Sequence, residues 1–397
     1  MTRNKMSILE KLNEIANYLM NSSNTAYNSN NLLGDKSGVA LFLFYMYKLT
    51  GRDECNNKAL DLLEDVIHIQ EAYEIIPTSV SKYGWLLNHL NNLGFIEAEL
   101  DDYFEEINFS LFEFMKSSLQ KDNYDFLHGS LGIVHYLLSV ENQTSKHYLT
   151  EFVGRFYKSA LQNENGSLKW TSVLDFDSKK KGFNISMSHG ISSIISVFSK
   201  IYLKGIEKEI TGRIVEGAVS YLLRQKLPSS KYNSIYSNYA LESMDKLHSS
   251  RLAWCYGDLG ISVALWHASQ ALGRKDWEKE SVDTILHASK RRGLVENGVV
   301  DAGLCHGTAG IAHIFNRMYG YTSLEELKQA SDYWFAETLK MASFEDGMAG
   351  FKAWQGEERG WVNEPGLLEG VAGIGLALIS AISDIEPAWD ECLLLSL

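Results

Sequence analysis

The sequence predicts an all-α fold, an α/α toroid in which helix pairs close into a double ring. Three observations support this prediction. A Gly-x-x-Gly step recurs along the 397 residues, an apolar stripe of helical period follows most copies, and only four prolines interrupt the chain. Such a repeat indicates stacked supersecondary units. Seven copies give seven helix pairs, roughly fourteen helices, and we expect residues 1–397 to form a single toroid domain.

The seven copies of the step differ in how complete they are. The first carries one extra residue, the second has Ser81 in place of its first glycine, and the fourth has Ser193 in place of its second. Small residues let neighbouring backbones approach closely, so we expect each step to begin a helix. The copies start at Gly34, Ser81, Gly129, Gly190, Gly257, Gly307 and Gly370.

The residues after the steps carry the stronger signal. From Val39, apolar side chains fall at i, i+3, i+4, i+7 and i+8, which predicts one buried face on an inner helix. The same template is filled from Ile194, Ile311 and Ile374. Charged amphipathic stretches between the steps predict outer helices, for example over residues 7–20, 58–72 and 323–340. An open solenoid is the alternative, and neither end of the chain looks like the polar cap it would need.

Two longer irregular stretches interrupt the repeat. Residues 227–250 are rich in Ser, Asn and Tyr, and residues 344–365 hold Trp354, Trp361 and several glycines. Long loops in compact domains are often lids or binding rims, and they are also often plain connections. The sequence leaves both interpretations open.

The charge balance excludes some partners. The chain has 37 basic and 50 acidic residues, which gives a formal net charge of −13. This balance argues against a nucleic-acid backbone or an anionic membrane surface as a partner, because both repel an acidic protein. A cationic substrate would suit it.

The cysteine count and the apolar segments indicate the compartment. Four cysteines are too few for a disulfide framework, and Cys55 and Cys392 look like ordinary small apolar residues. Residues 1–19 lack an uninterrupted signal-peptide core, and the apolar stretch at 371–385 is too short and interrupted to span a bilayer. We expect a cytoplasmic protein without a membrane span, which a biosynthetic complex could bring to a membrane.

Cysteine stands close before the glycine in two copies of the step. These copies read Trp254-Cys255-Tyr256-Gly257 and Leu304-Cys305-His306-Gly307. If every step begins an inner helix, the residues before the steps gather at one end of the toroid, where two thiols and an imidazole can share a metal. Zinc takes such ligands, and three of them leave a fourth position for water or substrate. Two buried apolar thiols or a disulfide are the alternatives.

These two cysteine motifs, with Arg251 ahead of the first, resemble those of the lanthionine synthetase C-like cyclases. The resemblance extends over essentially the whole chain, through the seven glycine steps and a similar length. It implies an α/α toroid with one catalytic zinc ion per chain. Members of this family add a peptide cysteine thiol to dehydroalanine or dehydrobutyrine and so close the thioether rings of lanthipeptide antibiotics.

The resemblance implies that Cys255, Cys305 and His306 are the zinc ligands. A free thiol has a pKa near ~8.5 and is mostly protonated at neutral pH, whereas a zinc-bound thiol is deprotonated and nucleophilic. Addition of the thiolate to the dehydro residue generates an enolate. The enolate needs a positioned proton donor, for which histidine titrates in the right range.

The resemblance assigns further roles around this chemistry. His189 matches the histidine motif of the family and is the candidate general acid/base, although Ser193 could shift the helix that follows it. Asp125 matches an aspartate segment and would orient or assist the acid/base. Arg251 and Tyr256 match the neighbours of the first zinc cysteine, and Arg251 could stabilise negative charge on the acyl oxygen.

Each of these residues also has an ordinary structural explanation. His189 could be a core histidine, Asp125 a helix cap, Arg251 an ion-pair partner and Tyr256 a packing residue. The family offers no role for His128, which we expect to be structural. Three histidines further along the inner helices, His135, His267 and His313, are expected to be ordinary helix residues.

The expected substrate is a dehydrated precursor peptide. The sequence holds no dehydratase domain, so a separate lanthipeptide dehydratase would have to supply that substrate. One alternative is a zinc-dependent enzyme that conjugates a small thiol such as glutathione to dehydroamino acids. Another is a prenyltransferase-like toroid, although such enzymes use Asp, Cys and His as ligands. A peptide-binding toroid without catalysis is the third.

Overall fold

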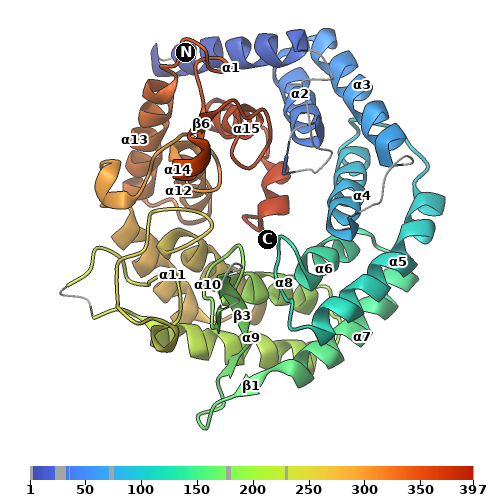
Figure 1. Cartoon of the computed structure of the whole chain (residues 1–397), viewed down its shortest axis with the longest axis vertical. Coiled ribbons are helices and arrows are strands. Elements are labelled where there is room, and N and C mark those ends of the chain that lie inside the picture. The colour runs from blue at the N-terminus through green and yellow to red at the C-terminus, as the bar shows by residue number, and fades with distance from the viewer. Residues whose placement is uncertain are drawn as a thin grey trace. The chain divides into compact units, whose positions relative to one another are not determined.

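The computed structural model describes residues 3–22, 33–34, 36–70, 76–175, 180–228 and 231–396 and is predominantly helical (Figure 1). It divides into two compact units. Unit 1 comprises Met1–Ser79 and Gly293–Asp390, and unit 2 comprises Val80–Arg292 and Glu391–Leu397. Asp35 of the first step and the end of the helix expected over residues 58–72 lie outside the described residues.

Unit 1 has three inner helices that are buried over most of their length and three outer helices that cover them. The inner helices are α2 (Lys36–Thr50), α12 (Thr308–Thr322) and α15 (Val371–Ile382), and the outer ones are α1 (Arg3–Asn21), α3 (Asp53–Gln70) and α13 (Glu325–Met341). α15 packs against α2 and α12, while α1, α3 and α13 pack on α15, α2 and α12 respectively (Figure 1). α15 is apolar on every side, as expected for a helix enclosed by others.

Unit 2 repeats this arrangement. Its inner helices are α4 (Pro77–Asn92), which begins in the last residues of unit 1, α6 (Ser130–Ser139), α8 (Ile191–Leu203) and α10 (Asp258–Leu272). Its outer helices are α5 (Asp101–Gln120), α7 (Gln143–Ser159), α9 (Lys208–Leu222) and α11 (Lys275–Ala288). α8 packs against both α6 and α10, and α9 and α11 cover α8 and α10 (Figure 1). Each outer helix buries one face only, because its other face is charged.

The loops that lead into the inner helices share one backbone design. In four of them, the first N–H after the N-cap glycine donates to the carbonyl oxygen seven residues earlier, over 2.9 to 3.2 Å. This bond satisfies a helix N–H that has no partner within the helix, and it closes the loop against the helix end. The donors are Ser130, Ile191, Thr308 and Val371.

The second glycine of the step is required by the same closure. A Cβ atom at Gly132 or Gly260 would lie 2.5 Å from a loop carbonyl oxygen, and one at Gly310 or Gly373 would lie 1.9 or 1.8 Å from one. The step is therefore glycine because the helix and loop backbones touch there. In the fourth copy, the buried Ser193 hydroxyl donates to the carbonyl of the N-cap glycine over 2.7 Å, and α8 still begins directly after that glycine.

The prediction that every step begins a helix is wrong for the second copy. Ser81 and Gly84 lie inside α4, which begins at Pro77. Proline favours the first turn of a helix, where its missing N–H costs nothing, so α4 begins a full turn before the step. Gly84 has a packing role instead, since a Cβ atom there would lie 2.6 Å from the Tyr136 ring of α6.

Short antiparallel hairpins, which the sequence did not indicate, lie in the loops. They pair β1 (Leu161–Gln162) with β2 (Leu168–Lys169), β3 (Ser172–Asp175) with β4 (Lys180–Gly182), and β5 (Ala353–Trp354) with β6 (Trp361–Val362). The last pair and the single turn α14 (Gly356–Arg359) give the stretch 344–365 a defined fold. α14 aside, the described part of the chain holds fourteen α-helices, which agrees with the predicted seven pairs.

Two of the inner-helix histidines contact carboxylate groups near the end of the chain. In unit 1, the ring nitrogens of His313 lie 2.9 Å from Ser380 Oγ and 2.8 Å from Asp390 Oδ2. In unit 2, His135 Nε2 lies 2.8 Å from Glu391 Oε2, and Trp85 Nε1 donates to the same carboxylate over 2.6 Å. These buried histidines have structural roles, since His313 ties α12 to Asp390 within unit 1 and His135 ties α6 to Glu391 within unit 2.

Candidate metal centre and acid–base pair

Cys255 lies in the loop that leads into α10 of unit 2. The loop ends at Gly257, whose φ of 94° favours glycine. The Cys255 side chain is buried, and its carbonyl oxygen accepts hydrogen bonds from Met187 N over 3.1 Å and from Ser188 Oγ over 3.3 Å. These bonds attach the cysteine loop to the loop that carries His189.

Asp125 and His189 form a close pair within unit 2. Asp125 Oδ2 lies 2.6 Å from His189 Nδ1, while Asp125 Oδ1 accepts the backbone N–H groups of Leu127 and His128 over 2.7 and 2.8 Å. His189 N in turn donates to Ser186 Oγ over 3.1 Å. Both partners are thus held by hydrogen bonds within their own loops, and the contact between them fixes the orientation of the imidazole.

The charges of this pair support each other. Burial alone would raise the pKa of the Asp125 carboxyl, but the contacts with His128 and His189 outweigh burial and hold that pKa well below its usual range. For His189, burial would lower the pKa, but the hydrogen bond and negative charge of Asp125, with a further contribution from Cys255, raise it. The pair therefore couples an ionised carboxylate to an imidazole that favours its protonated form.

The two other expected site residues, Tyr256 and Arg251, lie near Cys255 in the chain and differ in exposure. The Tyr256 ring lies 6.1 Å from the His189 ring and 6.0 Å from the Tyr239 ring, measured between centroids. Burial is the main cause that raises the pKa of Tyr256, so it stays a neutral phenol. Arg251 is exposed, which leaves its side chain open to solvent and to a bound molecule.

Cys305 and His306 lie in the equivalent loop of unit 1, directly before α12. The Cys305 N–H donates to Leu368 O over 2.9 Å, and both side chains are half-buried. The buried Asp301 accepts the N–H groups of Gly303 and Trp354 over 3.1 and 3.0 Å, and its Oδ2 lies 4.0 Å from His306 Nε2. A carboxylate beside one ring nitrogen is the usual outer partner of a metal-binding histidine.

Two sets of three side chains in the described residues have the composition of a metal site. One set is Cys255, Cys305 and His306, with the first residue in unit 2 and the others in unit 1, and the second is Asp125, His128 and His189. No disulfide joins the cysteines that the structure describes. The first set is the one that the sequence predicts, and its soft thiols and imidazole are typical zinc ligands.

Sequence reasoning missed several polar residues that shape these loops. Asn184, Asp301 and Glu364 each stand six residues before an N-cap glycine, and each side chain accepts the N–H two residues further on, over 2.9 to 3.1 Å. That fixed offset from the glycine step was visible in the sequence. Lys82, whose Nζ donates to Leu127 O over 2.9 Å, had no such signal, because its step is the degenerate copy inside α4.

The architecture matches a solved structure over almost its full length. A nisin cyclase structure superposes with a TM-score of 0.76 and 15% sequence identity, covering 98% of this chain and 97% of that one. This likeness confirms the all-α toroid predicted from the repeat. No helix in the described part of the chain is both long and apolar enough to cross a membrane.

Sequence comparisons give the family. The model of the lanthionine synthetase C-like protein family matches residues 7–394, so the chain belongs to that family. It is 23% identical over 345 residues to the nisin biosynthesis protein NisC of Lactococcus lactis subsp. lactis, across 83% of this chain and 74% of that protein. It is also 22% identical over 204 residues to the glutathione S-transferase LANCL1 of Danio rerio, across 50% of this chain and 47% of that protein.

Proposed function

We propose that this protein is a zinc-dependent lanthipeptide cyclase. It would add peptide cysteine thiols to dehydroalanine or dehydrobutyrine and so form lanthionine or methyllanthionine rings. Family membership and the similarity to NisC support this reaction class. The observation that carries the proposal is local to unit 2, where the Cys255 loop is hydrogen-bonded to the loop of the Asp125–His189 pair. A candidate thiolate ligand and a candidate proton donor thus lie on loops that are hydrogen-bonded to each other.

Cys255, Cys305 and His306 would hold one zinc ion per chain. The donor set fits the metal, because two thiols and one imidazole suit zinc and leave a position for a substrate. Asp301, whose Oδ2 lies 4.0 Å from His306 Nε2, would be a carboxylate neighbour of the metal-bound imidazole. Bound zinc would lower the pKa of the substrate cysteine thiol and so supply a thiolate at neutral pH.

His189 would supply the proton that completes the addition. As the thiolate sulfur bonds to the β-carbon of the dehydro residue, the electron pair of the carbon–carbon double bond shifts toward the acyl oxygen and gives an enolate. Because Asp125 engages Nδ1, the Nε2 nitrogen of His189 is left to protonate the α-carbon. The proton lost by the thiol restores His189 through solvent, so the net reaction is addition of S–H across the double bond.

Arg251 and Tyr256 would stabilise the enolate. The exposed guanidinium of Arg251 can pair with the negative acyl oxygen, and the neutral phenol of Tyr256 can donate a hydrogen bond near His189. Asp125 would act through His189, by fixing its orientation and favouring its protonated form. Removing Asp125 should therefore alter the pH dependence of the reaction as well as its rate.

The substrate would be a dehydrated precursor peptide made by a separate dehydratase. The excess of acidic residues suits a cationic peptide. The second candidate function is conjugation of glutathione to dehydroamino acids, which the similarity to a protein named glutathione S-transferase favours. Both functions use the same thiol chemistry and differ in the thiol that is accepted.

A synthetic peptide with one dehydroalanine and one cysteine separates these functions. Ring closure leaves the peptide mass unchanged but removes the thiol that reacts with N-ethylmaleimide, whereas conjugation adds the mass of glutathione. We expect thiol loss with zinc-loaded protein, even with glutathione present, and little of it with His189→Ala. His147→Ala, an exposed histidine of α7, is the matched control. A glutathione adduct as the main product would favour the second function, and no reaction of either kind would contradict both.

A further inference from the structure

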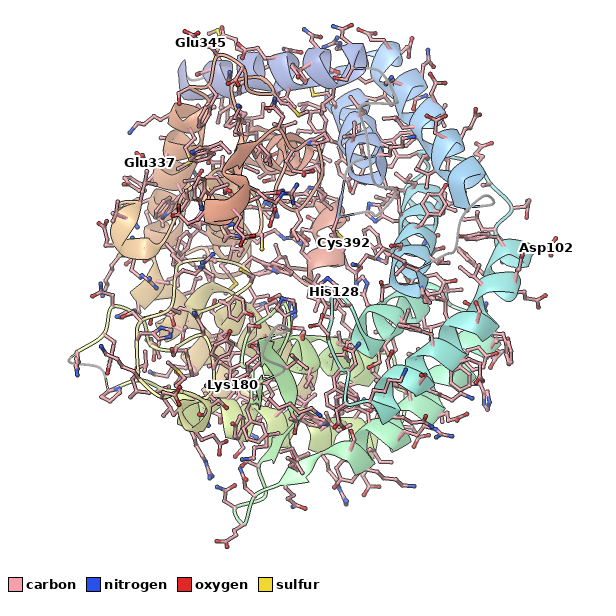
Figure 2. All side chains as sticks on the ribbon, in the orientation of Figure 1. Asp102, His128, Lys180, Glu337, Glu345 and Cys392 are labelled. Carbon is pink, nitrogen blue, oxygen red and sulfur yellow. The ribbon has the colours of Figure 1, made fainter. Side chains whose placement is uncertain are left out.

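His128 takes no part in the proposed reaction, yet it stands beside the acid–base pair. It lies at the end of the loop that leads into α6 (Figure 2), and its side chain is 66% exposed. His128 Nδ1 lies 3.4 Å from Asp125 Oδ1, and the rings of His128 and His189 are nearly parallel, with centroids 6.0 Å apart. One ligand atom from each of Asp125, His128 and His189 lies within 4.8 Å of the other two.

These spacings suit a small divalent transition metal. With metal–nitrogen and metal–oxygen bonds of about 2.0–2.1 Å, the ligand atoms of a tetrahedral site lie about 3.3 Å apart. The 3.4 Å between His128 Nδ1 and Asp125 Oδ1 places the His128 ring within reach of a metal held by this carboxylate. The contact of 2.6 Å between Asp125 and His189 is that of a hydrogen bond, so it would lengthen as the metal replaced the shared proton.

From this geometry we infer that Asp125, His128 and His189 form a second metal site, separate from the cysteine-containing set, that binds zinc or a similar transition metal. Zinc accepts both imidazole and carboxylate ligands, and imidazole also suits nickel and copper. Asp125 can accept two backbone N–H groups at Oδ1 and still offer lone pairs, since an ionised carboxylate has about four. The exposed His128 ring gives the metal a path from solvent.

The surrounding positive charges lower the affinity of this site for a metal ion. The half-buried Lys82 ammonium donates to Leu127 O in the same loop, and its positive charge faces Asp125. Lys181 lies near the loop as well, paired with Asp122 at 3.6 Å. Both cations oppose a second positive charge, so the site fills only when free metal is in excess. The cysteine-containing set, with two thiolates, would fill first.

Occupancy of this site would inhibit the enzyme, a consequence that rests on the proposed function. A metal on His189 and Asp125 would take the proton-donating imidazole out of the reaction and break its hydrogen bond to the carboxylate. Excess zinc should then slow ring closure, although a first zinc ion is needed for it. The binding itself does not depend on any reaction.

The first test is a measurement of zinc binding to untagged, zinc-loaded protein by equilibrium dialysis against increasing free zinc, with elemental analysis. Wild type and His147→Ala should take up one further zinc ion per chain, and His128→Ala should bind it at least about tenfold more weakly. An unchanged isotherm for His128→Ala, or no further zinc in wild type, would overturn the inference. His128→Asn keeps a polar side chain but loses the imidazole, so it should bind the further zinc ion as weakly as His128→Ala. Agreement between the two variants would attribute the weaker binding to the lost ligand and not to a loss of fold.

The second test adds the peptide assay. Excess zinc should inhibit wild type and His147→Ala but not His128→Ala, with each protein compared with its own activity in the absence of excess zinc. Inhibition that is equal in wild type and His128→Ala would refute the regulatory role. If the second zinc ion binds as expected but no variant closes rings, the metal site stands and the proposed function fails.

Discussion

The change Asp125→Asn is predicted to uncouple His189 from its partner while leaving the loop intact. Asparagine keeps an oxygen that can accept the N–H groups of Leu127 and His128, which hold the loop through Oδ1. It loses the negative charge that faces His189 Nδ1 at 2.6 Å. The amide also presents N–H groups toward that nitrogen, which favours the opposite imidazole tautomer.

The size of the effect follows from the contact that is lost. A hydrogen bond to a charged group contributes about 1.5–3 kcal/mol, and one pKa unit corresponds to about 1.4 kcal/mol. Without the hydrogen bond and negative charge of Asp125, the pKa of His189 should therefore fall. Loss of an oriented acid/base costs on the order of 10²–10⁴-fold in rate. Because the acid form of His189 donates the proton, the wild-type rate should decline only above pH ~6.5, and this decline should move to lower pH in the variant.

The pH dependence of folding stability should reveal the same coupling between Asp125 and His189. The pKa of His189 is raised on folding, so its contribution is fully present below pH ~6.5 and is lost as the pH rises through the raised value. The stability difference between wild type and Asp125→Asn should thus be largest in mild acid and narrow at alkaline pH.

Nuclear magnetic resonance titration of the His189 ring measures the pKa directly, and the peptide assay gives the pH–rate profile. Asp122→Asn is the matched control, because it makes the same chemical change in the same loop at a residue that bonds Tyr124 and Lys181. If the titration of His189 is the same in Asp125→Asn as in wild type, the proposed coupling is refuted. A shift in both variants would attribute the effect to net charge alone.

Two further predictions concern stability. Gly310→Ala would place a Cβ atom 1.9 Å from Leu304 O and should lower the thermal unfolding temperature by several degrees, whereas Gly320→Ala, in the same helix with open space around it, should stabilise by about 0.5–1 kcal/mol. Equal effects of the two changes in calorimetry would contradict the close approach of helix and loop. Burial would raise the pKa of Glu391, but the charges of His135 and Lys200 hold it below the usual range, so Glu391→Gln should cost about 1.5–3 kcal/mol near neutral pH. This cost should vanish as the pH falls through that lowered pKa, and a cost in urea unfolding that does not depend on pH would refute the ion pairing.

Much of the fold could be predicted because one close backbone contact recurs along the chain and requires a glycine each time. The close approach at Gly310 and Gly373 excludes any side chain, so the glycines mark the starts of inner helices. The failure at Ser81 has the same origin, since without that contact Pro77 set the helix start. The hairpins were missed because strands of two to four residues have no readable period. The expected single domain stays a prediction.

The candidate site could likewise be predicted only in part from the sequence. Cysteine and histidine ahead of the steps indicated the chemistry, and the resemblance to a family drew attention to Asp125 and His189. The direct bond between those two residues could not be predicted from the repeat, because it joins loops 64 residues apart. Asp301 and Lys82 were missed since neither has a residue type that is specific to a metal or acid–base site.

The zinc content of purified, untagged protein tests the central claim most directly. We predict about one tightly bound zinc ion per chain in wild type and in Cys55→Ala, whose cysteine belongs to neither candidate set. Cys255→Ala and Cys305→Ala should each lose that zinc while keeping the helical circular dichroism signal. Wild-type protein without zinc, or Cys305→Ala that retains a full equivalent, would contradict the proposed Cys255, Cys305 and His306 centre.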